Sequence, residues 1–473
     1  MIKDDPFFLD PRFRPHNMHH RHPDEFASRD PQLCLLRDLP AVHKPRLLET
    51  LPLGKPGIYS ITGGRQVGKT TLLKQWMERL LRSGVAPLDI VYLTGELIDD
   101  HHSLVMTVRA LLEREFAGDC VYLLLDEVTY IREWDRGVKY LADAGLLRKV
   151  VLVLTGSDAV VIRDARMRLP GRRGGEAVHD FHLYPLSFHD FLRLDGGLSP
   201  DILDGLADAS GQPSDATVDA LRGAFGTYLS TGGYLTAIND LKARGTISPA
   251  VYAVYCDWIR GDVLKRGKSE RYLKEVLGAV VKRLGSQITW NALASDLSID
   301  HPATIADYVE LLVRMDVLTV LPALVEDRLS GAPKKARKVV ISDPFVLHAV
   351  RSWLAPAADP YSERTLPLLA DPEWAGRLAE LCAGVHHARL HPTFYIKAEG
   401  EVDVAYVDKG RFWPLEVKWT GQVRPGDLKQ LRKYPNGGLL SREAAPTLHG
   451  IRNELLPLHL LRLGPSPDTT PEA

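Results

Sequence analysis

The chain has 473 residues, too many for one ordinary hydrophobic core, so we expect two to four domains. Hydrophobic residues make up 45% of the sequence and charged residues 25%, which is typical of a globular protein. A net charge of −1 excludes a global basic field, so a surface that binds nucleic acid must be a local patch. No apolar run approaches the roughly 18 residues that span a bilayer. The four cysteines are scattered, as is typical of reduced thiols, and we expect a cytoplasmic protein without a membrane partner.

Both ends of the chain are polar and rich in proline. We predict a flexible N-terminal arm over residues 1–35 and a disordered tail over residues 461–473. The arm contains a cluster of histidines, for which metal binding is the alternative interpretation: His16, His19, His20 and His22.

A phosphate-binding loop follows the first predicted strand. Residues 57–62 form a short apolar stretch typical of a buried strand, and a segment with helical periodicity begins at Thr70. Between them, Gly63 and Gly68 let backbone N–H groups wrap phosphates. We expect Lys69 to reach the β- and γ-phosphates of ATP and Thr70 to ligate Mg²⁺. The predicted nucleotide-binding residues are Gly63, Gly64, Arg65, Gln66, Val67, Gly68, Lys69, Thr70 and Thr71.

Further apolar strands are expected over residues 89–94, 121–125 and 149–155, and they alternate with helical segments. This alternation predicts an α/β fold with a doubly wound parallel sheet and nucleotide at the carboxyl ends of its strands. At one such end, we expect Asp126 to bind the nucleotide's Mg²⁺ and Glu127 to polarise the attacking water; a solvated acidic pair is the alternative. At another, Ser157 is placed to sense the γ-phosphate, unless it belongs to a simple turn.

Four motifs carry a family resemblance: residues 126–134, 154–158, 169–173 and 183–191. With them, the chain from about residue 40 to residue 440 resembles a bacterial and archaeal family of AAA+-like ATPases. The resemblance implies an ATPase core over residues 36–195 and a tendency to form homo-oligomers. It also implies that Arg172, with Arg173 as substitute, acts as an arginine finger on a neighbour's γ-phosphate. A solvated Gly- and Arg-rich loop is the alternative.

The middle of the chain is expected to be helical over residues 196–272 and to form a winged helix over residues 273–355. Two amphipathic helices near 290–298 and 302–314 precede strand-like runs at 317–321 and 338–342. The hairpin between these runs is basic, and we expect it to contact DNA phosphates. A packing lid and a merely solvated hairpin are the alternatives. The basic residues are Lys334, Lys335, Arg337 and Lys338.

A second candidate site lies in residues 356–460. Residues 401–407 and 413–419 alternate as a strand hairpin. Period two places Glu416 and Lys418 on one face, and pairing brings Asp403 into the same cleft. Two carboxylates suit Mg²⁺ or Mn²⁺, which polarises a scissile phosphate, while Lys418 orients the attacking water. Glu380, on a predicted upstream helix, adds a third carboxylate that serves as a metal ligand.

The order Glu380, Asp403, Glu416 and Lys418 resembles the PD-(D/E)XK nucleases, and its spacings are similar to those of archaeal Holliday-junction resolvases. Gln430 and Tyr434, on a predicted helix, resemble the Gln-x-x-x-Tyr element of RecB-type nucleases. The resemblance implies a small restriction-endonuclease-like α/β domain that acts on DNA, including branched DNA.

Together, the two candidate sites predict an enzyme that couples ATP hydrolysis to the binding and Mg²⁺-dependent cleavage of DNA. The alternative is a nucleotide-dependent switch with a catalytically dead nuclease fold. Such a switch would bind DNA or remodel a protein partner.

Overall fold

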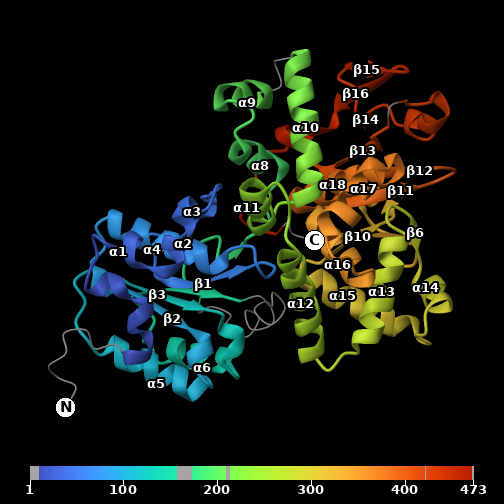
Figure 1. Ribbon diagram of the computed structural model, residues 1–473. Coiled ribbons are helices and arrows are strands. Elements are labelled where there is room, and N and C mark those ends of the chain that lie inside the picture. Colours follow the sequence, from blue (N-terminus) through green and yellow to red (C-terminus); the bar gives the residue numbers. More distant parts are fainter. Residues whose placement is uncertain (1–9, 157–172, 209–212, 421, 471–473) are drawn as a thin grey trace. The chain divides into compact units, whose positions relative to one another are not determined.

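The computed structural model describes residues 10–156, 173–208, 213–420 and 422–470. The chain divides into two compact units, one ending at Leu183 and the other beginning at Tyr184. Figure 1 shows the elements of each unit.

The first unit is built on a five-stranded parallel sheet in the order β2-β3-β4-β1-β5. Every residue of its four longer strands is buried, as expected for a parallel sheet covered on both faces. The doubly wound sheet predicted from the sequence is therefore confirmed. Its strands are β1 (Gly57–Thr62), β2 (Ile90–Thr94), β3 (Val121–Asp126), β4 (Val150–Thr155) and β5 (Asp180–His182).

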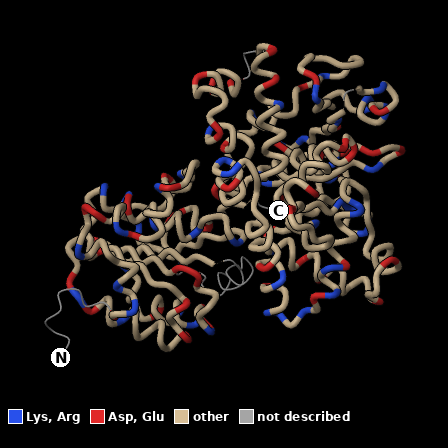
Figure 2. Tube along the Cα trace, in the orientation of Figure 1, with Lys and Arg blue, Asp and Glu red and all other residues tan. Residues whose placement is uncertain are grey.

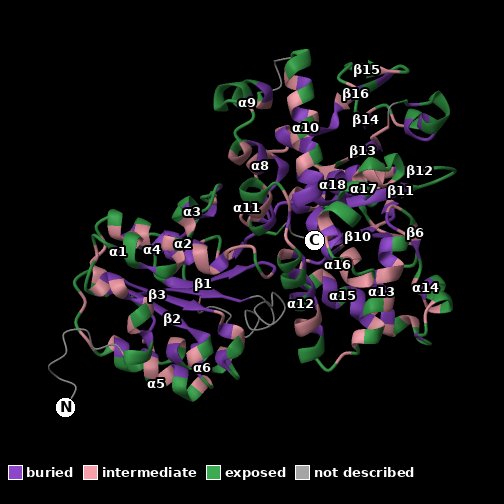
Figure 3. Ribbon diagram, viewed as in Figure 1, coloured by how far each residue is buried: buried purple, intermediate pink, exposed green. Residues whose placement is uncertain are grey.

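Two helical layers cover the two faces of this sheet, and alternate strand residues supply the two cores. Tyr122 and Leu124 of β3 join the core beneath α1, α2 and α4, whereas Leu123 and Leu125 join the core beneath α5 and α6. Figures 1 and 3 show the buried strands between these layers. The helices are α1 (Phe26–Arg29), α2 (Pro31–Arg37), α3 (Leu47–Thr50), α4 (Lys69–Arg82), α5 (His101–Leu112) and α6 (Trp134–Asp143), with short 3₁₀ turns between them.

The N-terminal segment differs from the predicted flexible arm, because residues 10–37 pack onto the five-stranded parallel sheet. Asn17 accepts a hydrogen bond from the Tyr92 N–H (2.7 Å) and donates one to the Tyr92 carbonyl (2.8 Å). Phe13 is fully buried, and the His19 ring bonds the Ile90 carbonyl. Tyr92 and Ile90 lie on β2, an edge strand whose backbone groups need partners. The arm prediction was wrong because it gave weight to prolines and overlooked the scattered apolar residues that anchor the segment.

The second unit begins with a group of helices. They include the long helices α10 and α12 and pack together with α16. Their bounds are α8 (Phe188–Asp195), α9 (Pro200–Ala207), α10 (Asp215–Thr231), α11 (Leu235–Arg244), α12 (Pro249–Lys265), α16 (Pro344–Leu354) and α17 (Leu366–Ala370).

Three further helices and a small antiparallel sheet lie between α12 and α16. The sheet has the order β6-β10-β7, and β7 pairs with β10 as the sequence predicted for this hairpin. A short pair, β8 with β9, lies within the hairpin. These elements are α13 (Glu270–Lys282), β6 (Gln287–Ile288), α14 (Trp290–Asp296), α15 (Pro302–Arg314), β7 (Leu318–Pro322), β8 (Leu324–Val325), β9 (Ser330–Gly331) and β10 (Arg337–Ile341).

The C-terminal part contains a mixed sheet in the order β11-β12-β13-β14-β16-β15. The predicted hairpin is present as antiparallel β12 and β13, and β14 continues the sheet in parallel to β13. Helix α18 contacts β12 and β13. The elements are α18 (Pro372–Leu390), β11 (Thr393–Lys397), β12 (Glu401–Asp408), β13 (Arg411–Lys418), β14 (Gly438–Ser441), β15 (Thr447–Leu448), β16 (Ile451–Leu455) and α19 (Leu456–Arg462).

The end of the chain also departs from the prediction of a disordered tail. Leu460 and Leu461 of α19 are fully buried, and the Ser466 N–H donates to the Asp190 carboxylate on α8. The tail prediction was wrong up to residue 470, because buried leucines anchor the segment that precedes its prolines. Among the described residues, no helix is both long and apolar enough to cross a membrane.

We predict that Asn17→Ala destabilises the sheet edge, because it removes both side-chain bonds to Tyr92 and leaves buried backbone groups unpaired. The expected loss is about 1–3 kcal/mol in the free energy of unfolding. Urea titration followed by circular dichroism measures it, with the exposed Asn291→Ala as control. A loss no larger than the control's would contradict the proposed anchoring.

Candidate functional sites

The loop between β1 and α4 has the backbone geometry of a phosphate cradle. Gly63 has φ 146° and Gly68 has φ 99°, both in the region that favours glycine. A Cβ on Gly63 would lie 2.4 Å from the Leu183 carbonyl oxygen, so this position excludes every side chain. The loop opens into the N-terminus of α4, where backbone N–H groups and the helix dipole favour an anion.

Lys69 begins α4 and turns its side chain back over this loop. The ammonium is buried and donates hydrogen bonds to the carbonyls of Gly63 (3.0 Å) and Gly64 (2.8 Å). These contacts hold its positive charge at the centre of the cradle, within reach of a phosphate bound there. Of the other loop residues, Gln66 is exposed with φ 63°, Arg65 is half-buried, and Val67 packs against the core. The Thr71 hydroxyl bonds the Gln32 amide of α2.

Asp126 lies at the carboxyl end of β3 and collects hydroxyl donors from three neighbouring elements. Thr70 of α4 donates to Oδ2 (2.7 Å), Tyr92 of β2 donates to the same oxygen (2.6 Å), and Thr155 of β4 donates to Oδ1. Burial and the Asp126 carboxylate raise the pKa of Tyr92, so its hydroxyl remains a donor. A threonine hydroxyl beside an aspartate is the donor set that Mg²⁺ uses in P-loop enzymes, and the residues present therefore fit this ion.

Glu127 follows Asp126 with a left-handed backbone (φ 50°), and its N–H donates to the Thr155 hydroxyl (3.0 Å). Thr155 therefore fixes both acidic residues. Sequence reasoning missed Thr155 and Tyr92, although a polar side chain in a buried, otherwise apolar strand is the signal that identifies them.

Ser157 and Arg172 lie outside the described residues. Arg173, the expected substitute finger, is engaged within its own unit, where its guanidinium pairs with Asp180 of β5 and donates to the His179 carbonyl. Ser60 of β1 bonds the same carboxylate. Arg173 therefore fastens β5 to β1, and this pairing argues against its role as a finger.

The second site lies where α18, β12 and β13 meet. Asp403 of β12 accepts the Val417 N–H (3.0 Å) and lies 3.9 Å from the Lys418 ammonium. Lys418 and Glu416, both on β13, pair at 2.6 Å. Glu380 of α18 joins this group through the Lys338 ammonium, which pairs with both Glu380 and Asp403. The structure thus brings together all four residues that the sequence placed in one cleft.

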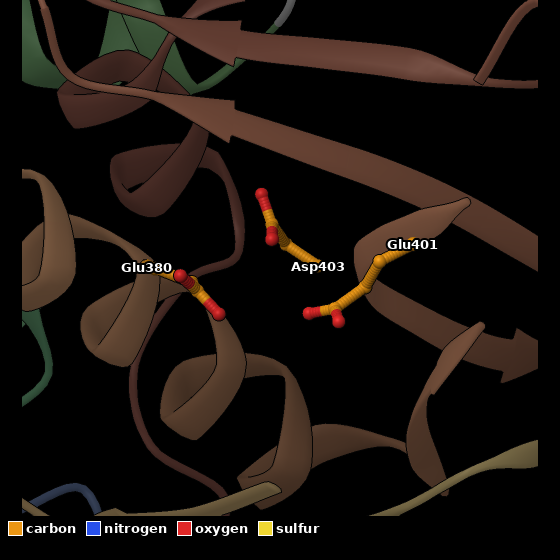
Figure 4. Close-up of side chains that lie close together, drawn as sticks. All are labelled: Glu380, Glu401 and Asp403. Atoms are coloured by element: carbon orange, nitrogen blue, oxygen red, sulfur yellow. The ribbon is translucent and has the colours of Figure 1, made fainter. Parts of the chain in front are cut away.

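Two residues that sequence reasoning did not assign to this site complete it. Lys338 of β10 pairs with Glu380 (2.6 Å), Glu401 (2.5 Å) and Asp403 (3.3 Å). The carboxylates of these three residues point toward one another (Figure 4). The expectation that Lys338 contacts DNA from an exposed hairpin was wrong, because its side chain is only 1% exposed. Neighbouring residues of a strand point to opposite faces, so Lys338 and Arg337 lie on different faces of β10. This strand position was the sequence signal that Lys338 could face the core.

Burial and the charges of neighbouring groups give the carboxyl groups of this site different pKa values. Burial, and then the charge of Asp403, raise the pKa of Glu416 to about 8 and that of Glu380 to about 7. Burial opposes ionisation of Asp403 as well, but Lys338 and Lys418 hold its pKa below the ordinary value. Asp403 therefore ionises more readily than Glu380 and Glu416.

The Gln-Tyr pair lies beside this sheet on a short 3₁₀ turn (Leu431–Lys433) in place of the predicted helix. Gln430 accepts the Gly400 N–H (3.2 Å), and the Tyr434 hydroxyl donates to Glu326 (2.8 Å). Gln430 therefore supports the loop before β12, and Tyr434 supports the β8–β9 hairpin.

Parts of the chain are similar to known families and to individual proteins. Residues 55–192 match the family model of the AAA domain, and residues 222–357 match a model described as a domain of unknown function. An uncharacterized protein of Haemophilus influenzae is 24% identical over 262 residues, which cover 53% of this chain and 59% of that protein. An uncharacterized protein of Methanocaldococcus jannaschii is 31% identical over 144 residues, 30% of this chain and 28% of that protein. The chain thus spans less than two thirds of either relative.

Solved structures with remote similarity include the Walker-type ATPase of Pyrococcus abyssi, with a TM-score of 0.40 and 13% identity over 74% of this chain and 100% of that one. Cdc6p from Pyrobaculum aerophilum has a TM-score of 0.22 and 16% identity over 74% of this chain and 97% of that one. The phosphate cradle and the Asp126–Glu127 pair both lie within the segment that matches the AAA domain. Residues 55–192 are therefore similar to the AAA domain, and the loop and acidic pair within them are those of a P-loop ATPase.

The raised pKa of Glu416 predicts that stability falls as pH rises. The pKa of the Glu416 carboxyl is near 4.5 in the unfolded state and about 8 in the folded state. Between these pH values the folded state holds a proton that the unfolded state has lost, and this contribution to stability disappears as pH rises toward 8. Glu416→Gln removes this contribution and should flatten the decline. Urea midpoints between pH 5 and 9 in EDTA measure it, with the exposed Glu373→Gln as control. Parallel curves for wild type and Glu416→Gln would contradict the shift.

Proposed function

We propose that this protein hydrolyses ATP in its first unit and uses the second unit to bind and cut DNA in a metal-dependent reaction. The observation that carries the DNA-cutting part is the cluster of Glu380, Asp403, Glu416 and Lys418, drawn from one helix and two strands. The cluster is polar and partly buried, and it holds more carboxylates than ammonium groups. Such a site suits a metal-dependent phosphodiester cleavage.

The ATPase part assigns each residue of the first site a separate role. Lys69 neutralises charge on the β- and γ-phosphates, while N–H groups of the loop hold the phosphate oxygens. Thr70 and Asp126 would hold Mg²⁺, which when bound neutralises charge developing on the phosphates. Glu127 orients and deprotonates the attacking water. Its strained backbone, fixed by Thr155, holds the carboxylate at the strand end.

The residues of the second site fit a divalent cation on charge and on unmet hydrogen bonding. Four carboxylates, from Glu380, Glu401, Asp403 and Glu416, face two ammonium groups, so full ionisation leaves an excess of two negative charges. Glu416 Oε2 is buried and makes no hydrogen bond to any described residue. When bound, a divalent ion supplies a polarised phosphate and an acidified water. Lys418 is placed to orient that water.

Contact with DNA is assigned to the hairpin of the small sheet, which with α13, α14 and α15 we interpret as a winged helix. Lys334 and Lys335 are exposed in the turn between β9 and β10 and suit backbone phosphates. Helix α15 instead exposes Asp307 and Glu310, whose charges repel phosphate. Figure 2 shows Lys and Arg interspersed with Asp and Glu along the described residues, so a DNA contact in this unit would be a local one.

Lys338 favours one alternative, a nucleotide-dependent switch whose nuclease fold binds DNA, or remodels a protein partner, without cutting. Its ammonium fills the space between three of the carboxylates, where a metal would otherwise be held. Homo-oligomers, with Arg172 reaching a neighbouring protomer, are part of either proposal.

Replacing Lys69 tests the ATPase part. Lys69→Ala removes the positive charge from the cradle and is expected to lower ATP turnover on the order of 10²–10³-fold. A phosphate-release assay measures it, with the exposed Lys139→Ala of α6 as control. Undiminished turnover in Lys69→Ala would overturn the assignment of the loop.

Replacing Asp403 tests the nuclease part, because the two neighbouring lysines hold the pKa of this carboxylate low. With Mn²⁺ or Mg²⁺, wild type is expected to cut duplex, single-stranded or four-way-junction DNA, and Asp403→Asn is expected to lose this activity while keeping ATP hydrolysis. Labelled substrates with and without ATP measure both, with the exposed Asp327→Asn as control. Cleavage that survives Asp403→Asn would place the site elsewhere, and wild type that cuts none of these substrates would favour the switch.

A further inference from the structure

Lys338 lies at the centre of the carboxylate cluster as a cation supplied by another part of the second unit. It belongs to β10 of the small sheet, whereas Glu380 comes from α18 and Glu401 and Asp403 from β12. We propose that the Lys338 ammonium is the resident cation of this site and competes with divalent metal for these carboxylates. This inference rests on the proposed nuclease function for its consequence, since it makes metal loading the step that controls cutting.

The geometry of the ammonium matches its surroundings closely. An ammonium has three N–H donors, and three carboxylates surround this one at 2.6, 2.5 and 3.3 Å. One oxygen from each carboxylate lies within 4.8 Å of the others, a span that suits a single cation. A divalent ion bonds such oxygens at about 2.0–2.6 Å. A metal and the ammonium using the same three oxygens would therefore lie so close that their charges repel strongly. Occupation by one excludes the other.

The placement of Lys338 is firmly built. Its side chain is 1% exposed, and a buried ammonium is tolerated only when its partners are well arranged. The backbone around it is also tied down, because the Tyr395 hydroxyl of β11 donates to the Ala336 carbonyl (2.6 Å). A second residue of the small sheet, Gln287 of β6, donates to Glu401. The small sheet thus reaches the acid cluster through two residues on neighbouring strands.

Removing the Lys338 ammonium changes the charge of the site in a defined way. It takes away one of the two ammonium groups and leaves four carboxylates facing Lys418 alone. The carboxylates then repel one another and gain affinity for a divalent cation.

The test uses the full chain without nucleotide and titrates Mn²⁺ by calorimetry. Lys338→Gln is expected to bind one Mn²⁺ at least tenfold more tightly than wild type, and Mn²⁺ is expected to raise its melting temperature by more than that of wild type. Lys335→Gln, an exposed change of the same kind on the same hairpin, is expected to match wild type. Adding Asp403→Asn to Lys338→Gln should remove the gained binding. Equal Mn²⁺ affinity in Lys338→Gln and wild type would overturn the proposal.

A second measurement uses the native protein and covers the case in which Lys338→Gln does not fold. Reductive methylation followed by peptide mass spectrometry compares lysines on the same hairpin. Lys334 and Lys335 are expected to be modified readily, whereas Lys338 stays unmodified with and without millimolar Mn²⁺. Modification of Lys338 at the rate of Lys335 would overturn its role as a resident cation.

Neither readout depends on ATP or DNA, so the two proposals fail separately. Gained Mn²⁺ binding by Lys338→Gln without DNA cleavage supports the inference and overturns the nuclease part of the proposed function. Cleavage by wild type together with unchanged Mn²⁺ affinity in Lys338→Gln overturns the inference and supports the nuclease part of the proposed function.

Discussion

A buried carboxylate at the end of a strand must be given donors, and this constraint organises the first site. Asp126 lies 3% exposed at the end of β3, and the hydroxyls of Thr70, Tyr92 and Thr155 meet it from α4, β2 and β4. Satisfying one carboxylate thereby fixes the relative positions of the phosphate cradle and two neighbouring strands. The same hydroxyl of Thr155 also holds the backbone of Glu127. The chemistry of the site and the packing of the sheet edge therefore depend on one set of hydrogen bonds.

The second site meets the same constraint with charge. Asp403 is half-buried, and Lys338 beside one of its oxygens and Lys418 beside the other hold its pKa below the ordinary value, while each lysine also pairs with a glutamate. Two ammonium groups do not neutralise four carboxylates, and burial first, then the charge of Asp403, raises the pKa values of Glu380 and Glu416. The site is therefore a place where a cation is required and where the identity of that cation decides what the domain does. The structure supplies a lysine where a nuclease would supply a metal.

The covering of the sheet edge links the N-terminal segment to the nucleotide site. Asn17 bonds both backbone groups of Tyr92, whose hydroxyl bonds Asp126. Asp30 of the same segment forms a buried ion pair with Lys74 of α4 (3.1 Å), and the Lys74 ammonium lies over the Tyr92 ring. The segment before the ATPase core therefore belongs to the structural support of Asp126, although its composition is that of a surface arm.

The sequence by itself determined the local parts of this protein. It placed the glycine loop between β1 and α4, the acidic pair after β3, and the β12–β13 hairpin that carries Asp403, Glu416 and Lys418, because spacing and periodicity along the chain are enough for such elements. The tertiary structure alone decided which distant groups meet. Lys338 is 65 residues from Asp403, and its direction depends on how β10 packs against α18 and β12. Asn17 and Tyr92 are likewise joined only by the docking of a segment onto an edge strand 75 residues away. A residue's periodicity shows which face it occupies, but its partner across that face is set by the packing of elements far apart in the sequence.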